Sequence, residues 1–146
     1  MGLDMYLQTI PKDKVPKDYI EFCKFSDEAW ESHKKYERTL MDWRKANQIH
    51  HWFCENCKCL KPEILYLVTP EDLSKLCATM EKVLKDHKKA PLLLPTCQGF
   101  FYGSLEYDEW YFDELEYSLK HLKEILEAIE DDDLLEKKAL IYYASW

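Results

Sequence analysis

The chain has 146 residues, of which 47% are hydrophobic and 14% aromatic, and its formal net charge is −8. A chain of this length and aromatic content buries one substantial core, which excludes a disordered protein. The negative charge argues against direct binding to nucleic-acid backbones, which requires a basic surface. No run of about 18 apolar residues is present, so no membrane span is expected. The sequence predicts a single domain, residues 1–146, in the cytoplasm.

The first third of the chain predicts a strand followed by a helix. Residues 2–10 alternate apolar and polar side chains, which is typical of a strand with one buried face. A short helix is expected over Asp18–Lys24. From about Lys34 to Asn56 apolar residues recur at spacings of three and four, which predicts one long helix. Its apolar stripe comprises Leu40, Trp43, Ala46, Ile49 and Phe53.

The middle of the chain predicts a buried strand and the most clearly marked helix. Ile64–Val68 is a short apolar run rich in branched and aromatic residues. Thr69 then precedes Pro70 and two acids, so we expect Thr69 to cap a helix that begins at Pro70. Apolar residues at helical spacing continue as far as Leu84.

The last third predicts two further strands around a long helix. Ala90–Thr96 is bracketed by prolines and is expected to be a connection, whereas Gly99–Gly103 is expected to be a short strand. Ser104 or Asp108 should cap the long helix that follows. Ala139–Ala144 is expected to be the closing strand.

Helices that alternate with strands in this way predict an α+β or mixed α/β fold. We expect a small, mostly antiparallel sheet of about four strands with three to four helices packed on it.

The negative charge is concentrated in one segment, residues 104–136. Thirteen acids and two bases lie there, which gives a local net charge of −11. Such a segment is most often a solvated helix face. The alternatives are a docking surface for a basic host protein and a mimic of nucleic acid.

A group of histidines and cysteines near residues 50–59 suggests a metal site. Thiolates and imidazoles are the ligands that zinc prefers, in tetrahedral sets of four. The usual distant second pair of ligands is missing, so the bland alternative is that these thiols pack as small apolar side chains. The candidate zinc ligands are His51, Cys54, Cys57 and Cys59.

His50 and Cys54 are also four residues apart, the spacing of a base and a nucleophile on one helix face. The sequence shows no recognisable oxyanion hole and no third group to orient the histidine, so a catalytic pair is less favoured than two non-catalytic side chains.

Polar residues flank the apolar stripe between Arg44 and His51. Asn47 and His50 lie on the same side of the predicted helix as Trp43, where unpaired polar groups would be costly to bury. They either hydrogen-bond to neighbouring strands as a structural network or point into a pocket and bind a ligand.

Five blocks spread over the chain resemble a group of small proteins from bacteriophages and prophages. They are Met1–Leu7 (MGLDMYL), Trp43–Phe53 (WRKANQIHHWF), Leu94–Ser104 (LPTCQGFFYGS), Asp108–Tyr111 (DEWY) and Ala144–Trp146 (ASW). The resemblance implies an accessory role in the host cell: modulating the host, or countering a host defence, by binding. Cys54, Cys57 and Cys59 are not part of what these blocks share, so the resemblance does not extend to a metal site.

The resemblance favours the pocket for the polar flank, since acidic and aromatic residues of the other blocks could converge on it. An aromatic-lined cleft with cationic and amide donors suits a small anionic or nucleotide-like ligand. We therefore expect a non-enzymatic protein that binds such a ligand or a host protein. The alternatives are a small enzyme acting on a nucleotide-like substrate with His50 as acid or base, and a zinc-stabilised interaction module. The candidate ligand-binding residues are Asp4, Arg44, Lys45, Asn47, His50, Asp108, Trp110 and Tyr111.

Overall fold

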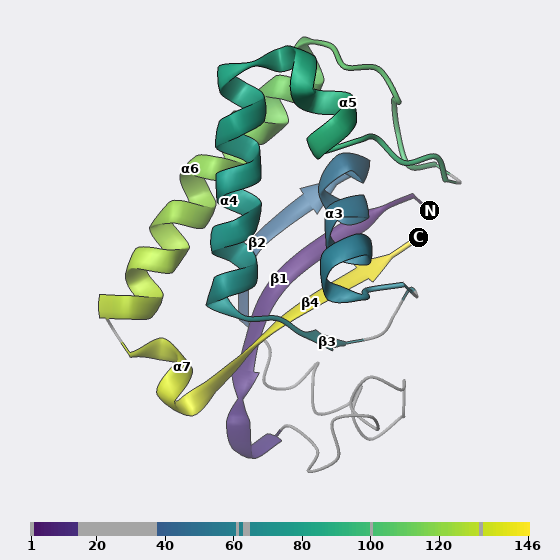
Figure 1. Ribbon diagram of the computed structural model, residues 1–146. Coiled ribbons are helices and arrows are strands. Elements are labelled where there is room, and N and C mark those ends of the chain that lie inside the picture. Colours follow the sequence, from purple (N-terminus) through teal and green to yellow (C-terminus); the bar gives the residue numbers. More distant parts are fainter. Residues whose placement is uncertain (1, 15–37, 61, 63–64, 100, 132) are drawn as a thin grey trace.

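The computed structural model describes residues 2–14, 38–60, 62, 65–99, 101–131 and 133–146 (Figure 1). Within them, four strands form one antiparallel sheet in the order β2-β1-β4-β3. The helices α3, α4 and α6 pack on one face of this sheet (Figure 1). The predicted α+β fold with an antiparallel sheet of about four strands is confirmed.

The two central strands come from the two ends of the described chain. β1 (Asp4–Pro11) pairs along its whole length with β4 (Lys138–Ser145), in a register that sets Asp4 opposite Ser145. Both strands were predicted, because each alternates side chains that face the helices with side chains that do not. The N- and C-terminal ends consequently lie side by side (Figure 1).

The long helix predicted from Lys34 to Asn56 is wrong in its first half. Arg38–Arg44 is the edge strand β2, and only Asn47–Cys57 is helical, as α3. Met41 and Trp43 are buried while Asp42 is exposed, which is a period of two. Over so few residues that period is indistinguishable from the helical spacing of the stripe, and pairing with β1 decides for the strand.

The junction between β2 and α3 is a sharp turn at Lys45. Lys45 has φ +57°, in the left-handed region, and Ala46 then serves as the N-cap of α3. The helix ends at Lys58, which is also left-handed and whose N–H donates to the carbonyl of Phe53. The turn brings Arg44 and Lys45 to the start of α3.

The buried strand predicted over Ile64–Val68 is present only as β3 (Tyr66–Leu67), a half-buried strand at the edge of the described sheet, and residue 64 lies outside the described residues. α4 (Pro70–Lys85) begins where Thr69 predicted it. The Thr69 hydroxyl accepts a hydrogen bond from the backbone N–H of Asp72 at 3.1 Å. The Asp72 carboxylate accepts one from the backbone N–H of Thr69 at 2.9 Å. This reciprocal pair satisfies two N–H groups that a helix otherwise leaves free.

Two predictions between α4 and α6 are wrong. Ala90–Leu93, expected to be a connection, is the short helix α5, because Pro91 is tolerated in a first helical turn. The expected strand at 99–103 is a turn in which the Tyr102 N–H donates to the carbonyl of Gly99 at 3.3 Å. The segment contacts the chain just before β1, where the Leu3 N–H donates to the carbonyl of Phe101 at 3.4 Å, but it is not a strand of the described sheet.

α6 (Glu109–Asp131) is the long predicted helix, and Asp108 rather than Ser104 caps it. The Asp108 carboxylate accepts from the backbone N–H of Tyr111 at 3.1 Å. The remaining elements are short: η1 (Lys12–Lys14), η2 (His87–Lys89) and α7 (Leu134–Lys137). The short helix predicted at 18–24 lies outside the described residues.

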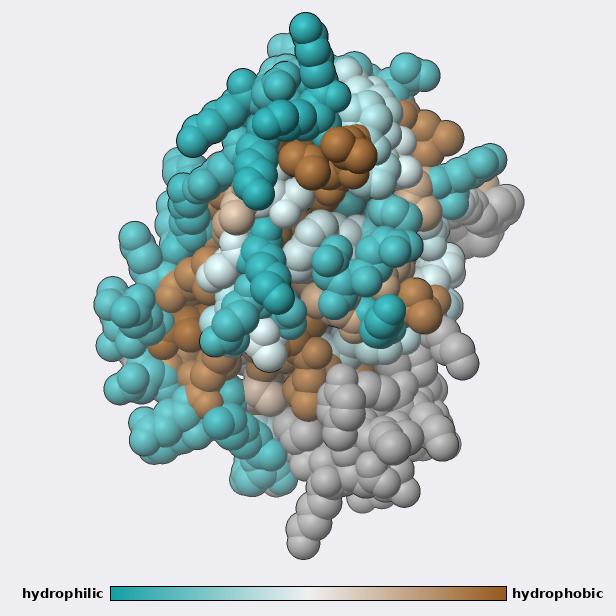
Figure 2. Space-filling model, in the orientation of Figure 1, coloured by the Kyte–Doolittle hydropathy of each residue, from teal (hydrophilic) through white to brown (hydrophobic). Residues whose placement is uncertain are grey.

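The main core lies between the sheet and the three longer helices. Among the buried hydrogen bonds between these layers, the Trp43 indole N–H of β2 donates to the Ser118 hydroxyl of α6 at 2.8 Å. On the face shown in Figure 2, hydrophobic side chains appear in groups separated by hydrophilic ones. Among the described residues no helix is long and apolar enough to cross a membrane.

Candidate functional site

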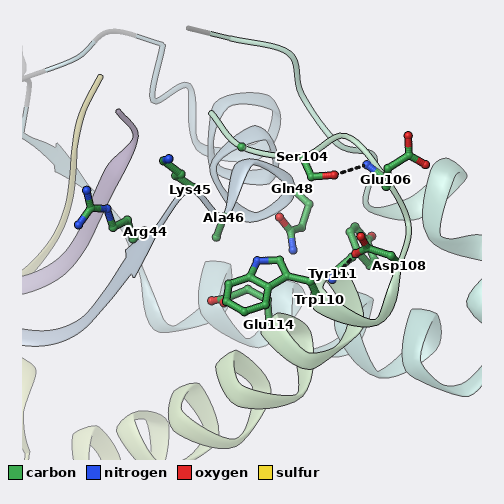
Figure 3. Close-up of a pocket in the computed structure, with 11 residues that line it drawn as sticks. Arg44, Lys45, Ala46, Gln48, Ser104, Glu106, Asp108, Trp110, Tyr111 and Glu114 are labelled. Atoms are coloured by element: carbon green, nitrogen blue, oxygen red, sulfur yellow. Dashed lines mark hydrogen bonds between the residues drawn. The ribbon is translucent and has the colours of Figure 1, made fainter. Parts of the chain in front are cut away.

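A pocket of about 440 Å³ opens between the β2–α3 junction and the loop that leads into α6 (Figure 3). Segments that are far apart in the sequence therefore meet around it. Its lining comprises Arg44, Lys45, Ala46, Gln48, Gly103, Ser104, Glu106, Asp108, Trp110, Tyr111 and Glu114. Five of the eight predicted ligand-binding residues are among them: Arg44, Lys45, Asp108, Trp110 and Tyr111.

Charges of opposite sign lie on opposite sides of the pocket. Arg44 and Lys45 stand on one side, and Glu106 and Asp108 on the other (Figure 3). Asp4 does not line the pocket; its carboxylate lies 3.8 Å from the Arg44 Nε, because the strand register sets the two residues opposite each other. Asp4 is thus placed to orient Arg44.

Trp110 is the most exposed aromatic side chain in the pocket, with 71% of its surface accessible. Tyr111, beside it, is buried, and its hydroxyl donates to the carbonyl of Leu94 at 2.5 Å. Burial raises the pKa of the Tyr111 phenol, which stays protonated. Tyr111 is therefore part of the wall, whereas Trp110 presents a free indole face.

The loop that closes the pocket passes close to Lys45 at Gly103. This glycine has φ +94°, and a Cβ built on it would lie 3.1 Å from the Lys45 Cβ and 3.2 Å from the Lys45 carbonyl oxygen. Both the conformation and the close approach require glycine here. Gly103 thereby lets the loop lie directly against the cationic side of the pocket.

Asn47 holds this loop in place and does not line the pocket. Its amide donates to the carbonyls of Tyr102 and Ser104 at 3.0 and 2.9 Å, and its oxygen accepts from the N–H of Cys97 at 3.0 Å. Of the two fates predicted for Asn47, the structural network is the one present. Asn47 is not among the lining residues, and its side chain supports the pocket wall from behind.

His50 is also structural. It is buried, with its Nδ1 2.7 Å from the Tyr142 hydroxyl and its ring centroid 4.8 Å from that of Trp146. Burial, with a smaller contribution from His51, lowers the pKa of His50 to about 4. A neutral imidazole enclosed in the core is not among the residues that line this pocket.

The predicted contact between His50 and Cys54 exists, with 3.4 Å between Nε2 and Sγ. Burial raises the pKa of the Cys54 thiol to about 11, and the thiol donates to the carbonyl of Cys59 at 3.0 Å. Near neutral pH both partners are uncharged, so the pair lacks the thiolate that a cysteine nucleophile needs.

The candidate zinc ligands are not gathered around one point. In the described ranges, no three His, Cys, Asp or Glu side chains are close enough to hold a metal ion. The Cys57 thiol lies beside Asp72, and burial raises its pKa to about 12. His51 instead lies 4.0 Å from Glu55. A zinc set of His51, Cys54, Cys57 and Cys59 therefore has no support in the geometry.

Four polar residues of the pocket were not among the predicted ligand-binding residues: Gln48, Ser104, Glu106 and Glu114. Gln48 follows Asn47 in α3, and only 5% of its surface is accessible. Glu114 is half-buried, and burial raises the pKa of its carboxyl. Glu114 stands one helical turn after Trp110, and residues four apart share a helix face. This spacing was the sequence signal that could have identified Glu114 as a pocket residue.

Comparison of the chain with family models, with curated proteins and with solved structures finds no match.

Proposed function

We propose that this protein is a phage- or prophage-encoded accessory protein that acts by binding, and that its pocket holds a small anionic, nucleotide-like ligand. One observation carries the proposal: an exposed indole, Trp110, faces a pocket whose opposite side carries Arg44 and Lys45. A planar ring and an anionic group joined in one molecule would satisfy both sides. The resemblance to small phage and prophage proteins supports the accessory role.

The cationic side of the pocket suits a phosphate. Arg44 and Lys45 supply two positive charges immediately before the start of α3. The first turn of α3 contains no acid, and its N-cap residue, Ala46, has no side chain that could accept a hydrogen bond from the first backbone N–H groups. The positive end of the helix dipole therefore adds to the two cations, and such helix starts favour anions.

The Trp110 side suits a heteroaromatic ring. An exposed indole face gains from stacking with a base, by about 1–3 kcal/mol for each base in single-stranded nucleic-acid complexes. A volume of about 440 Å³ falls within the range of roughly 300–1,000 Å³ that is usual for small-molecule sites. The pocket is thus large enough for one mononucleotide.

Two features support binding without catalysis: the state of the His50–Cys54 pair and the surroundings of Ser104. The pair that a nucleophilic mechanism would use, His50 and Cys54, is uncharged near neutral pH and stands outside the pocket. Ser104 lines the pocket, but its hydroxyl accepts a hydrogen bond from the N–H of Glu106 at 3.1 Å and has no base beside it in the described structure.

The test is a titration of the purified protein with nucleoside monophosphates and cyclic nucleotides, read by melting temperature and by calorimetry. At least one should raise the melting temperature in a concentration-dependent way. Trp110→Ala should weaken its binding by about 10-fold or more, given the value of one stacked base. The matched control is Tyr117→Ala, another exposed aromatic of α6 that lies outside the pocket lining.

Two results would overturn the proposal: no nucleotide shifts the melting temperature, or Trp110→Ala binds as well as the wild type. Turnover of a nucleotide by the purified protein would instead favour the enzymatic alternative.

The exposed face of α6 favours a second candidate, a docking surface for a basic host protein. Its exposed acids include Glu109, Asp113, Glu116, Glu124 and Glu127, with the half-exposed Tyr117 among them. Charge reversal at Asp113 and Glu116 separates the candidates, since both residues are exposed and neither lines the pocket. If a host phenotype is lost with these reversals and kept in Trp110→Ala, the surface is the functional site.

A further inference from the structure

Gln48 presents an amide to the pocket without a partner. Its side chain is 5% accessible and lines the pocket, yet it makes no hydrogen bond within the described structure. Figure 3 shows the amide turned toward the indole of Trp110. Among the described residues only the Thr9 hydroxyl is a fully enclosed side-chain group without a partner, so the Gln48 amide still meets the open space of the pocket, where a ligand can take the place of water. An amide in this position is therefore suited to a ligand that supplies the missing partner.

Glu114, which is half-buried, presents a carboxylate to the same pocket. It stands one turn after Trp110 on α6, so both side chains are on one side of the helix and both line the pocket. Desolvation is the cause of its raised pKa, and neither an ion pair nor a hydrogen bond holds its carboxylate in the described residues. The other two acids of the lining differ: Asp108 is engaged in capping α6, and Glu106 is exposed at the rim.

The two unpartnered groups offer a defined set of donors and acceptors next to the indole. An ionised carboxylate only accepts hydrogen bonds, through two oxygens, whereas an amide both donates and accepts. A ring stacked on Trp110 would fit best if its edge carried two neighbouring donors for Glu114 and one acceptor for the Gln48 amide N–H.

Among the nucleobases, guanine has that edge. Its N1–H and N2 amino group are adjacent donors, and O6 beside them is an acceptor. Adenine would turn its N1 lone pair toward the carboxylate. Cytosine offers one amino donor followed by two acceptors, and uracil one N–H between two carbonyl groups. Repulsion between acceptor lone pairs and a desolvated carboxylate disfavours these three.

We propose that the pocket selects a guanine nucleotide, with Gln48 and Glu114 as the residues that read the base. This inference rests on the proposed function, because Trp110, Arg44 and Lys45 must first hold the ring and the phosphate.

The test is calorimetric titration of the intact protein with the 5′-monophosphates of guanosine, inosine, adenosine, cytidine and uridine. The guanosine compound should bind about 10- to 100-fold more tightly than the adenosine compound, as expected for hydrogen bonds to a charged group. The inosine compound lacks the amino group at N2 and should lie between the two.

Glu114→Gln should reduce the preference for guanosine over adenosine monophosphate to within about 3-fold, because the second acceptor oxygen is replaced by a donor. Gln48→Met keeps the length of the side chain and removes its amide, so it should weaken guanosine monophosphate binding without lowering the melting temperature. Glu116→Gln is the matched control on α6, since Glu116 is exposed and outside the lining; it should change neither.

The outcomes distinguish the two proposals. If all five monophosphates bind equally and Trp110→Ala weakens them all, base selection is wrong and the proposed function stands. Tighter binding of adenosine monophosphate, or an unchanged guanosine preference in Glu114→Gln, also overturns the inference. If no nucleotide binds, both proposals fail.

Discussion

His50 belongs to a residue type that often acts in catalysis or binding, but here its environment gives it a structural role. Its two ring nitrogens meet the Tyr142 hydroxyl and the Cys54 thiol, and aromatic rings of Tyr102 and Trp146 enclose it. In this setting a proton on the ring would be a desolvated charge. The neutral form is therefore favoured by folding, which links the stability of the protein to pH.

Stability should decrease as the pH falls through the range between the unfolded and folded pKa values of His50. The unfolded pKa is the ordinary 6.5 and the folded pKa is about 4, so over that range the unfolded chain binds more protons. We expect His50 to lower the free energy of unfolding by about 2 kcal/mol between about pH 7 and about pH 5. Urea denaturation at the two pH values measures this.

His50→Phe should be less stable at neutral pH, because Tyr142 loses its partner, but its stability should depend less on pH. His121→Ala, which removes a histidine at the surface of α6, should keep the wild-type pH dependence. An undiminished pH dependence in His50→Phe would contradict the assignment.

At the scale of elements, the start of a helix is decided locally. The capping box of Thr69 and Asp72 involves four consecutive residues, and its signal is readable in the sequence. The start of α3 has no such signal: Ala46 has no capping side chain, and the break from β2 depends on the left-handed Lys45. This difference explains why one boundary was predicted and the other was not.

Thr69→Ala should destabilise the protein by about 1 kcal/mol, because the N–H of Asp72 loses its acceptor at the helix start. Thr79→Ala is the matched control within α4: its hydroxyl donates to the Lys75 carbonyl in the helix interior, where alanine is the better helix former. Its stability should equal or slightly exceed that of the wild type. Thermal unfolding of both variants measures the difference, and equal losses would contradict the cap.

At the scale of the whole molecule, the pocket depends on how α6 docks on the sheet. The buried Trp43–Ser118 hydrogen bond joins β2 to α6 two turns after Trp110, and Asn47 anchors the intervening loop to α3. These contacts fix Trp110 and Glu114 of one helix against Gln48 of another. The geometry of the pocket is therefore a property of the assembled layers.

Ser118→Ala should destabilise the protein by about 1–3 kcal/mol, because the buried indole N–H of Trp43 loses its acceptor. If the proposed pocket is correct, this variant should also bind its nucleotide more weakly, although residue 118 does not line the pocket. Ser74→Ala, at an exposed position of α4, is the control and should change neither property. Calorimetry and thermal unfolding measure the two effects separately, and an unchanged stability of Ser118→Ala would contradict the role of this bond.

The sequence by itself determined the elements whose patterns are strong and local. β1, β4, α4 and α6 follow from hydrophobic periodicity, and the cap at Thr69 follows from a side chain within three residues of the N–H group that it satisfies. For α6 the sequence offered Ser104 or Asp108 as the cap, and the structure shows Asp108. The α+β class follows from the order of these elements. Five residues of the pocket were also named, on the basis of residue type and of the family resemblance.

Only the tertiary structure decided where β2 ends and α3 begins, because the same apolar spacing fits a strand and a helix until pairing with β1 selects one. It also decided the roles of the polar residues. Asn47 and Gln48 are adjacent amides in α3, yet the first is fully hydrogen-bonded to the loop and the second faces the pocket. That division depends on which backbone groups are brought close from fifty residues away, and the periodicity of one helix carries no information about it.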